Sequence, residues 1–178
     1  MGYYERHLPH WHPDGAMLFV TWRLHGSLPS CQLAGGFAEM DRLLDGGAIG
    51  PQWLREERIA RVVIETVGYA ERQLRLFDSR AWVIMPNHVH LLLQPRAPLA
   101  RITRSVKSYS GRKANEILGL AKQPFWQHES YDHWVRDRYE AEKIVRYVER
   151  NPVKAGLAAV EGEWPSLSAW DKAPALSR

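Results

Sequence analysis

Two short apolar segments that meet at Pro86-Asn87 constrain the fold of this chain more than any other feature. Residues 74–85 alternate loosely between polar and apolar side chains, and residues 88–94 form a second apolar run that ends at Pro95. Proline followed by asparagine is typical of a turn, because proline fixes one backbone dihedral and asparagine tolerates tight geometry. The pattern therefore predicts two strands that meet at this turn.

Further elements are predicted on both sides of the strand pair. In chain order they are a strand over 16–24, helices over 54–69 and 99–118, and a loop leading into a strand over 124–136. A last helix begins at Asp137 and is expected to end at Asn151-Pro152, because a residue that precedes proline disfavours helical backbone. This order predicts an α+β sandwich of one antiparallel sheet with helices on one side.

The chain of 178 residues is predicted to form one domain, residues 1–178, with a core over about 16–157. Glycine, proline and serine interrupt residues 25–53, which we interpret as an insertion. A helical piece near Phe37 to Leu44 is expected there, but it looks too broken to form a packed element.

The composition limits the class of protein. Hydrophobic residues make up 45% and charged residues 25%, which excludes a disordered chain, and no run approaches the roughly 20 apolar residues of a membrane helix. Cys31 is the only cysteine, and no segment resembles a signal peptide, so a cytoplasmic protein is expected. The net charge of +4 favours a polyanionic partner without identifying one.

His88 and His90 are the strongest candidates for metal ligands. Alternate side chains of a strand point to the same face, so the two imidazoles of His88-Val89-His90 project together and can hold one ion. The alternative interpretation is a pair of ordinary polar residues at the end of a strand, because short motifs often occur by chance.

Tyr147 and Asn151 lie one helical turn apart in the last predicted helix and border its buried face. If that face packs on the strand with His88 and His90, Asn151 could be a third metal ligand and Tyr147 could approach the substrate. Taken alone, Tyr147 could equally be a tyrosine at the edge of the core, and Asn151 a residue that ends a helix.

The combination of two segments resembles a known family. Residues 82–92 (WVIMPNHVHLL) and 147–157 (YVERNPVKAGL) are similar to the single-tyrosine HUH transposases, and specifically to the REP-associated group. Supporting matches occur at Phe125-Trp126-Gln127 and in residues 106–109, so the resemblance covers most of the chain.

The resemblance implies a ferredoxin-like βαββαβ fold, with the histidine strand in the centre of the sheet and the tyrosine on a carboxyl-terminal helix. It also implies that His88 and His90 hold a metal and that Tyr147 is the nucleophile. Asn151 would complete the site, where relatives in insertion sequences usually carry glutamine. A further departure is Val20-Thr21-Trp22-Arg23, where the REP-associated group often has Gly-Thr-Trp-Ser.

The implied reaction is attack by Tyr147 on a phosphodiester of single-stranded, hairpin-associated DNA. It would give a 5′-phosphotyrosine link and a free 3′-hydroxyl. A 3′-hydroxyl would later attack the phosphotyrosine and rejoin strands. An unactivated phenol is a poor nucleophile at neutral pH, so a divalent metal is expected, Mg²⁺ or Mn²⁺, with Zn²⁺ also possible for these ligands. A DNA partner would place the protein at the nucleoid, as a monomer or a homodimer.

Other functional interpretations follow from the same residues. Arg101, Arg104, Lys107 and Arg112 could contact the DNA backbone from the outer face of their helix, or be ordinary solvated surface. Tyr109 is a rival nucleophile, but its spacing from Ile102 and Val106 places it in the predicted core. A hairpin-binding module that no longer cuts and a phosphodiesterase that uses activated water are the alternative functions.

Overall fold

The computed structural model describes residues 4–5, 9–10, 12–13, 15–28, 36–46, 50–120, 122–165 and 167–168. Its main sheet is antiparallel throughout, with the strand order β6-β3-β5-β4-β7. Its strands are β3 (Leu18–Arg23), β4 (Phe77–Ile84), β5 (His88–Pro95), β6 (Tyr131–Trp134) and β7 (Leu167–Ser168). Two short strands, β1 (Tyr4–Glu5) and β2 (Pro9–His10), pair separately.

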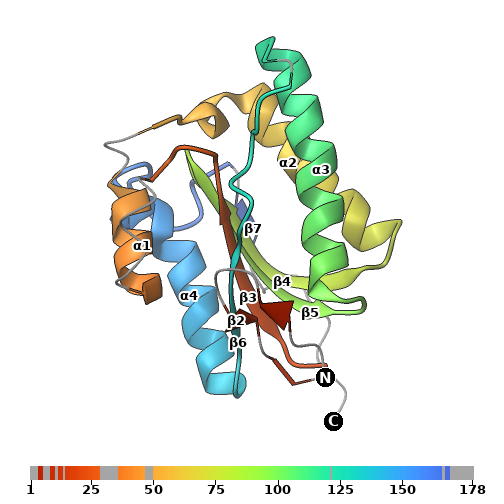
Figure 1. Ribbon diagram of the computed structural model, residues 1–178. Helices are drawn as coiled ribbons and strands as arrows, with labels where there is room; N and C mark the ends of the chain where they lie inside the picture. Colours follow the sequence, from red (N-terminus) through yellow and green to blue (C-terminus); the bar gives the residue numbers. More distant parts are fainter. Residues whose placement is uncertain are drawn as a thin grey trace.

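The helices lie in two layers, one on each face of this sheet (Figure 1). The layer of α2 (Glu57–Arg72) and α3 (Leu99–Leu118) covers one face, and the short η2 (Trp53–Arg55) precedes α2. The layer of α1 (Gly36–Asp45) and α4 (Arg138–Lys154) lies on the other face.

The expectation of helices on one side of the sheet is therefore wrong, and the burial of β5 gives the reason. Val89, Leu91 and Leu93 belong to the core under α2 and α3, whereas Leu92 belongs to a second hydrophobic cluster with α4 residues such as Val148. A strand that is apolar on both faces needs a cover on both faces.

The predicted segments otherwise match the observed elements closely. The helix over 99–118 has those bounds in α3, and the turn at Pro86-Asn87 joins β4 to β5. Asp137 caps α4 as expected, because its side chain accepts a hydrogen bond from the backbone N–H of Glu140 at 2.8 Å.

One boundary and one prediction of packing were wrong. Helix α4 does not end at Asn151-Pro152 but continues to Lys154, since Asn151 and Pro152 are buried and their packing outweighs the one hydrogen bond that proline cannot donate. The helical piece of the insertion is a packed helix, α1, in which Asp41 and Leu44 are buried. Both corrections bear on the candidate site.

Candidate metal centre and tyrosine site

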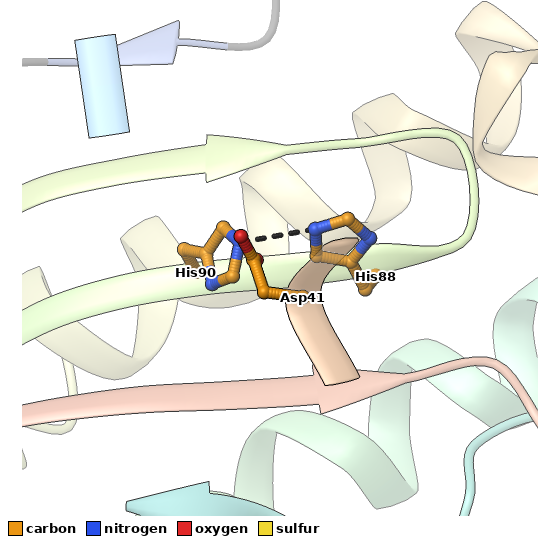
Figure 2. A group of neighbouring side chains, drawn as sticks. All are labelled: Asp41, His88 and His90. Carbon is orange, nitrogen blue, oxygen red and sulfur yellow. Dashed lines mark hydrogen bonds and ion pairs between the residues drawn. The ribbon is translucent and has the colours of Figure 1, made fainter. Parts of the chain in front are cut away.

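His88 and His90 point together from the middle strand of the sheet, on the face that α1 and α4 cover (Figure 2). Their Nε2 atoms lie 3.0 Å apart, and neither side chain is exposed. The predicted projection of the two imidazoles to one face is confirmed. Two nitrogen atoms at this distance need a proton or a cation between them, because two facing lone pairs repel.

The outer nitrogen of each imidazole is held by a neighbouring side chain. Nδ1 of His88 donates to Oδ1 of Asn87 at 2.7 Å, and the Asn87 amide is oriented by its own donation to the carbonyl of Leu44 at 3.0 Å. Nδ1 of His90 hydrogen-bonds the hydroxyl of Thr21 at 2.7 Å. An Nδ1 atom that donates leaves Nε2 with a free lone pair, so the Asn87 contact prepares His88 as a ligand.

Asp41 approaches the pair from α1 (Figure 2). Its Oδ1 lies 3.1 Å from Nε2 of His90, and one ligand atom from each of Asp41, His88 and His90 falls within 4.8 Å of the others. Burial raises the pKa of the Asp41 carboxyl, but hydrogen bonding and attraction from His90 outweigh it and lower the pKa to about 2. The carboxylate is therefore charged at neutral pH.

Tyr147 completes this group from α4. Its hydroxyl lies 3.5 Å from Nε2 of His90, and the edge of its ring packs on His90 and Phe19, with centroids 5.5 and 6.0 Å apart. The hydroxyl also hydrogen-bonds Asp41. Burial, followed by the negative charge of Asp41, raises the pKa of the phenol, so the hydroxyl keeps its proton in this arrangement.

Asn151 lies one turn after Tyr147 and is completely buried. It lies near enough to Tyr147 to lower the pKa of that phenol, yet neither atom of its amide group completes a hydrogen bond in the described structure. Burying an amide that completes no hydrogen bond costs free energy, so the presence of Asn151 at this buried position needs an explanation.

Asp45 and Lys154 extend the charged group at its margin. Nζ of Lys154 lies 3.0 Å from Asp45 and 3.6 Å from Asp41, and Oδ1 of Asp45 lies 4.0 Å from Nε2 of His88. Burial and repulsion from Asp41 raise the pKa of Asp45. The ammonium group of Lys154 thus lies beside the carboxylates of Asp41 and Asp45, which α1 holds near the histidines.

The chemistry of these donors fits a divalent cation. Two imidazole nitrogens and a carboxylate oxygen are suitable ligands for Mn²⁺ or Zn²⁺, and Mg²⁺ accepts the carboxylate most readily. Oδ1 of Asp45 is a buried oxygen that completes no hydrogen bond in the described residues, a state that a cation would relieve.

The predicted DNA-contacting residues lie away from this centre. Arg101, Arg104, Lys107 and Arg112 belong to α3, on the opposite face of the sheet, where they line a groove with residues 122–132. Lys107 donates to the carbonyl of His128 at 2.9 Å and to Ser130 at 3.1 Å, whereas Arg101 and Arg104 are exposed.

Tyr109 is not part of the core, contrary to the prediction. Half of its side chain is exposed, and the guanidinium of Arg112 lies 5.3 Å from the centre of its ring. Ser110 and Gly111 take the buried positions at this level of α3, because the chain at Phe125-Trp126 approaches the helix there. Tyr109 lies on α3, across the sheet from the histidine pair.

Sequence reasoning brought together His88, His90, Tyr147 and Asn151 but missed Asp41, Asp45, Lys154 and Thr21. One signal was available: Asp41 and Asp45 are four residues apart, so they share a face of any helix that forms in the insertion.

Comparison with known proteins identifies the family. Residues 55–151 match the family described as "Transposase IS200 like". The chain belongs to this IS200-like transposase family. The matched region contains both histidines, Tyr147 and Asn151, whereas Asp41 and Lys154 lie outside it.

Two curated relatives of this transposase are distant. A putative REP-associated tyrosine transposase of Haemophilus influenzae is 28% identical over 103 residues, which cover 52% of this chain and 58% of the relative. The REP-associated tyrosine transposase of Escherichia coli K12 is 28% identical over 94 residues, covering 51% and 53%. The chain thus spans about half the length of the curated relatives it matches.

A solved structure shares the fold of this transposase. A REP-associated tyrosine transposase bound to a REP hairpin superimposes with a TM-score of 0.57 at 22% identity, over 94% of this chain and 82% of that one. The sequence match confirms the predicted family, and the solved structure shows that the fold is shared. In the described residues, no helix has the length and apolar character needed to cross a membrane.

Proposed function

We propose that this transposase is a metal-dependent DNA strand transferase and single-strand endonuclease in which Tyr147 is the nucleophile. The observation that carries the proposal is the Tyr147 hydroxyl, 3.5 Å from Nε2 of His90 and beside the facing imidazoles. A reacting hydroxyl and a metal-binding pair at this separation can both reach one phosphate group.

The reaction that we propose is an exchange of phosphodiester bonds. The Tyr147 oxygen bonds to phosphorus, the bond from phosphorus to the 3′-oxygen breaks, and the phenolic proton passes to water while the 3′-oxygen takes up a proton. The product is a 5′-phosphotyrosine and a free 3′-hydroxyl. Because the phosphotyrosine is itself an ester, a 3′-hydroxyl can attack it in the reverse sense and rejoin strands without ATP.

His88 and His90 would hold the divalent metal, Mg²⁺ or Mn²⁺, with a third donor from Asn151, as predicted, or from Asp41. When bound, the metal would polarise the phosphate and stabilise negative charge on its oxygens. The protein contributes orientation: Asn87 and Thr21 fix the imidazoles, and Phe19 holds the Tyr147 ring edge-on.

The substrate that we propose is single-stranded DNA that forms a hairpin. The solved relative is bound to a REP hairpin, and this chain has the same fold and a basic surface on α3 that includes Arg101 and Arg104. Such a partner would place the protein at the nucleoid in the cytoplasm, as a monomer or a homodimer.

The finer description of the fold supports the same assignment. Strands β3, β4, β5 and β6 with the helices α2 and α3 follow the order βαββαβ, and their spatial order places β5 between β3 and β4. We therefore propose a ferredoxin-like core over about 16–157, with residues 25–53 inserted, in a single domain of 1–178.

The test is the capture of the covalent intermediate. A labelled, hairpin-bearing single strand is incubated with Mn²⁺ and the protein, and an adduct that survives denaturation is expected. Tyr147→Phe should abolish the adduct. Tyr139→Phe is the matched control, because Tyr139 lies on the same helix but is 63% exposed and contacts Lys143 instead of the site.

Two results would favour other functions. Hairpin binding by wild-type protein without any cleavage would indicate the binding module derived from a transposase. Cleavage by Tyr147→Phe, with no adduct in the wild type, would indicate a phosphodiesterase that uses activated water.

A further inference from the structure

Helix α1 closes the candidate site. His88 and His90 have no exposed surface, and Asp41 reaches from α1 to the histidine pair (Figure 2). A phosphodiester cannot approach Nε2 of His90 while this helix is docked. The reaction proposed above therefore requires α1 to move away from β5.

Asp41 contacts the same groups that a scissile phosphate would contact. Its carboxylate lies 3.1 Å from Nε2 of His90 and hydrogen-bonds the Tyr147 hydroxyl, and these are the two groups that a scissile phosphate must contact. A carboxylate and a phosphodiester both present anionic oxygens to such partners. We propose, on the basis of the function above, that Asp41 occupies the position of the scissile phosphate and that single-stranded DNA displaces α1 to reach it.

The way in which α1 is docked makes it displaceable by a polyanion. Among the described side chains of α1, Leu44 is buried but belongs to neither of the two hydrophobic clusters. Three contacts of the described residues of α1 are polar: Asp41 with His90, Asp45 with Lys154 at 3.0 Å, and the Leu44 carbonyl with Asn87 at 3.0 Å. The anionic contacts of Asp41 and Asp45 can be exchanged for contacts with other anions, whereas the buried side chain of Leu44 opposes the displacement.

Lys154 offers a second point of exchange. It contacts both carboxylates of α1 and lies at the margin of the site, with 55% of its side chain exposed. When Asp41 and Asp45 withdraw, its ammonium group is free to contact a phosphate next to the scissile one. The DNA backbone thus replaces two carboxylates with two phosphates.

Asn151 explains how the site stays complete after the exchange. Its buried amide completes no hydrogen bond in the described residues, and it belongs to α4, one turn after Tyr147. The oxygen that Asp41 withdraws from the histidine pair can therefore be replaced by the Asn151 amide oxygen. Asp41 is then a temporary occupant of the site.

The test compares DNA affinity in Asp41→Asn and in wild-type protein by fluorescence anisotropy, with EDTA present so that no cleavage interferes. If docked α1 excludes DNA, the apparent DNA affinity equals the affinity of the open form multiplied by the fraction of molecules that are open. Asp41→Asn should raise that fraction and therefore bind a hairpin-bearing single strand about tenfold more tightly. Glu57→Gln is the matched control, since it removes the same charge from an exposed site on α2.

Hydrogen exchange gives a second, independent measurement. Amides of residues 40–45 should be protected in the free protein and exchange faster when DNA is bound. Asp45→Asn should loosen α1 without removing the contact to His90, and it should raise DNA affinity as Asp41→Asn does. The Asp45→Asn variant keeps the proposal testable if Asp41→Asn fails to fold.

Three results would overturn the proposal. The first is that both α1 variants bind DNA no more tightly than Glu57→Gln. The second is that the amides of α1 stay equally protected in the DNA complex. The third is that Asp41→Asn loses Mn²⁺-dependent cleavage at saturating DNA, because that loss would make Asp41 a permanent metal ligand. The absence of any phosphotyrosine adduct in the wild type would instead reject the proposed function, and the binding and exchange measurements would still decide the role of α1.

Discussion

The hydroxyl of Thr21 lies 2.7 Å from Nδ1 of His90, its direct neighbour across the pair of strands β3 and β5. This contact fixes the ring of His90 so that Nε2 faces His88. The orientation of the candidate ligand therefore depends on a side chain from another strand, which the metal would never touch.

Thr21→Val should weaken metal binding while preserving the fold. Valine matches the shape of threonine and suits a strand, but it cannot hydrogen-bond the imidazole. Loss of such an orienting partner typically lowers metal affinity about 10- to 100-fold. Calorimetric titration with Mn²⁺ measures the effect, and Thr66→Val on α2, whose hydroxyl donates to the Val62 carbonyl, is the control. Equal Mn²⁺ affinity in both variants would contradict the role of Thr21.

Metal addition should stabilise the wild-type protein. A ligand that binds only the folded state contributes about 2.7 kcal/mol at 100 times its dissociation constant. The melting temperature should therefore rise with Mn²⁺ and return to its starting value with EDTA. His88→Ala should abolish the rise because it removes one of two facing nitrogens. A rise of equal size in His88→Ala would place the bound ion elsewhere.

The histidine pair could be predicted from the sequence because its geometry is local. Alternation along one strand fixes the shared face of His88 and His90, and helical spacing fixes that of Tyr147 and Asn151. The bounds of α3 were predictable for the same reason, since twenty residues of periodic pattern leave little ambiguity.

Asp41 could not be predicted because its position depends on how the insertion packs. Nothing in the spacing between Asp41 and His90 indicates that α1 folds back over β5. The exposure of Tyr109 was missed for a related reason: the apolar face of α3 is shared with Phe125 and Trp126, which lie far along the chain and shift the buried positions to Ser110 and Gly111.

Ser110→Ala should lower the free energy of unfolding, because it leaves the buried indole N–H of Trp126 without an acceptor. The indole N–H of Trp126 donates to the Ser110 hydroxyl at 2.9 Å, and both side chains are buried. A buried donor without an acceptor costs about 1 to 3 kcal/mol. Urea unfolding measures the loss, and Ser108→Ala, at an exposed position of the same helix, should change stability little. A similar midpoint for the two variants would show that water replaces Ser110.

Substitution of Asn151 should move stability and metal affinity in opposite directions. Asn151→Leu replaces a buried amide that completes no hydrogen bond with an apolar side chain of similar size, so the metal-free protein should become more stable by about 1 kcal/mol. The same change removes the predicted third donor and should weaken Mn²⁺ binding. Asn151→Gln keeps an amide oxygen and should retain Mn²⁺ binding better than Asn151→Leu. Unfolding curves without metal and Mn²⁺ titrations measure the two effects, and an Asn151→Leu protein with wild-type Mn²⁺ affinity would remove Asn151 from the ligand set.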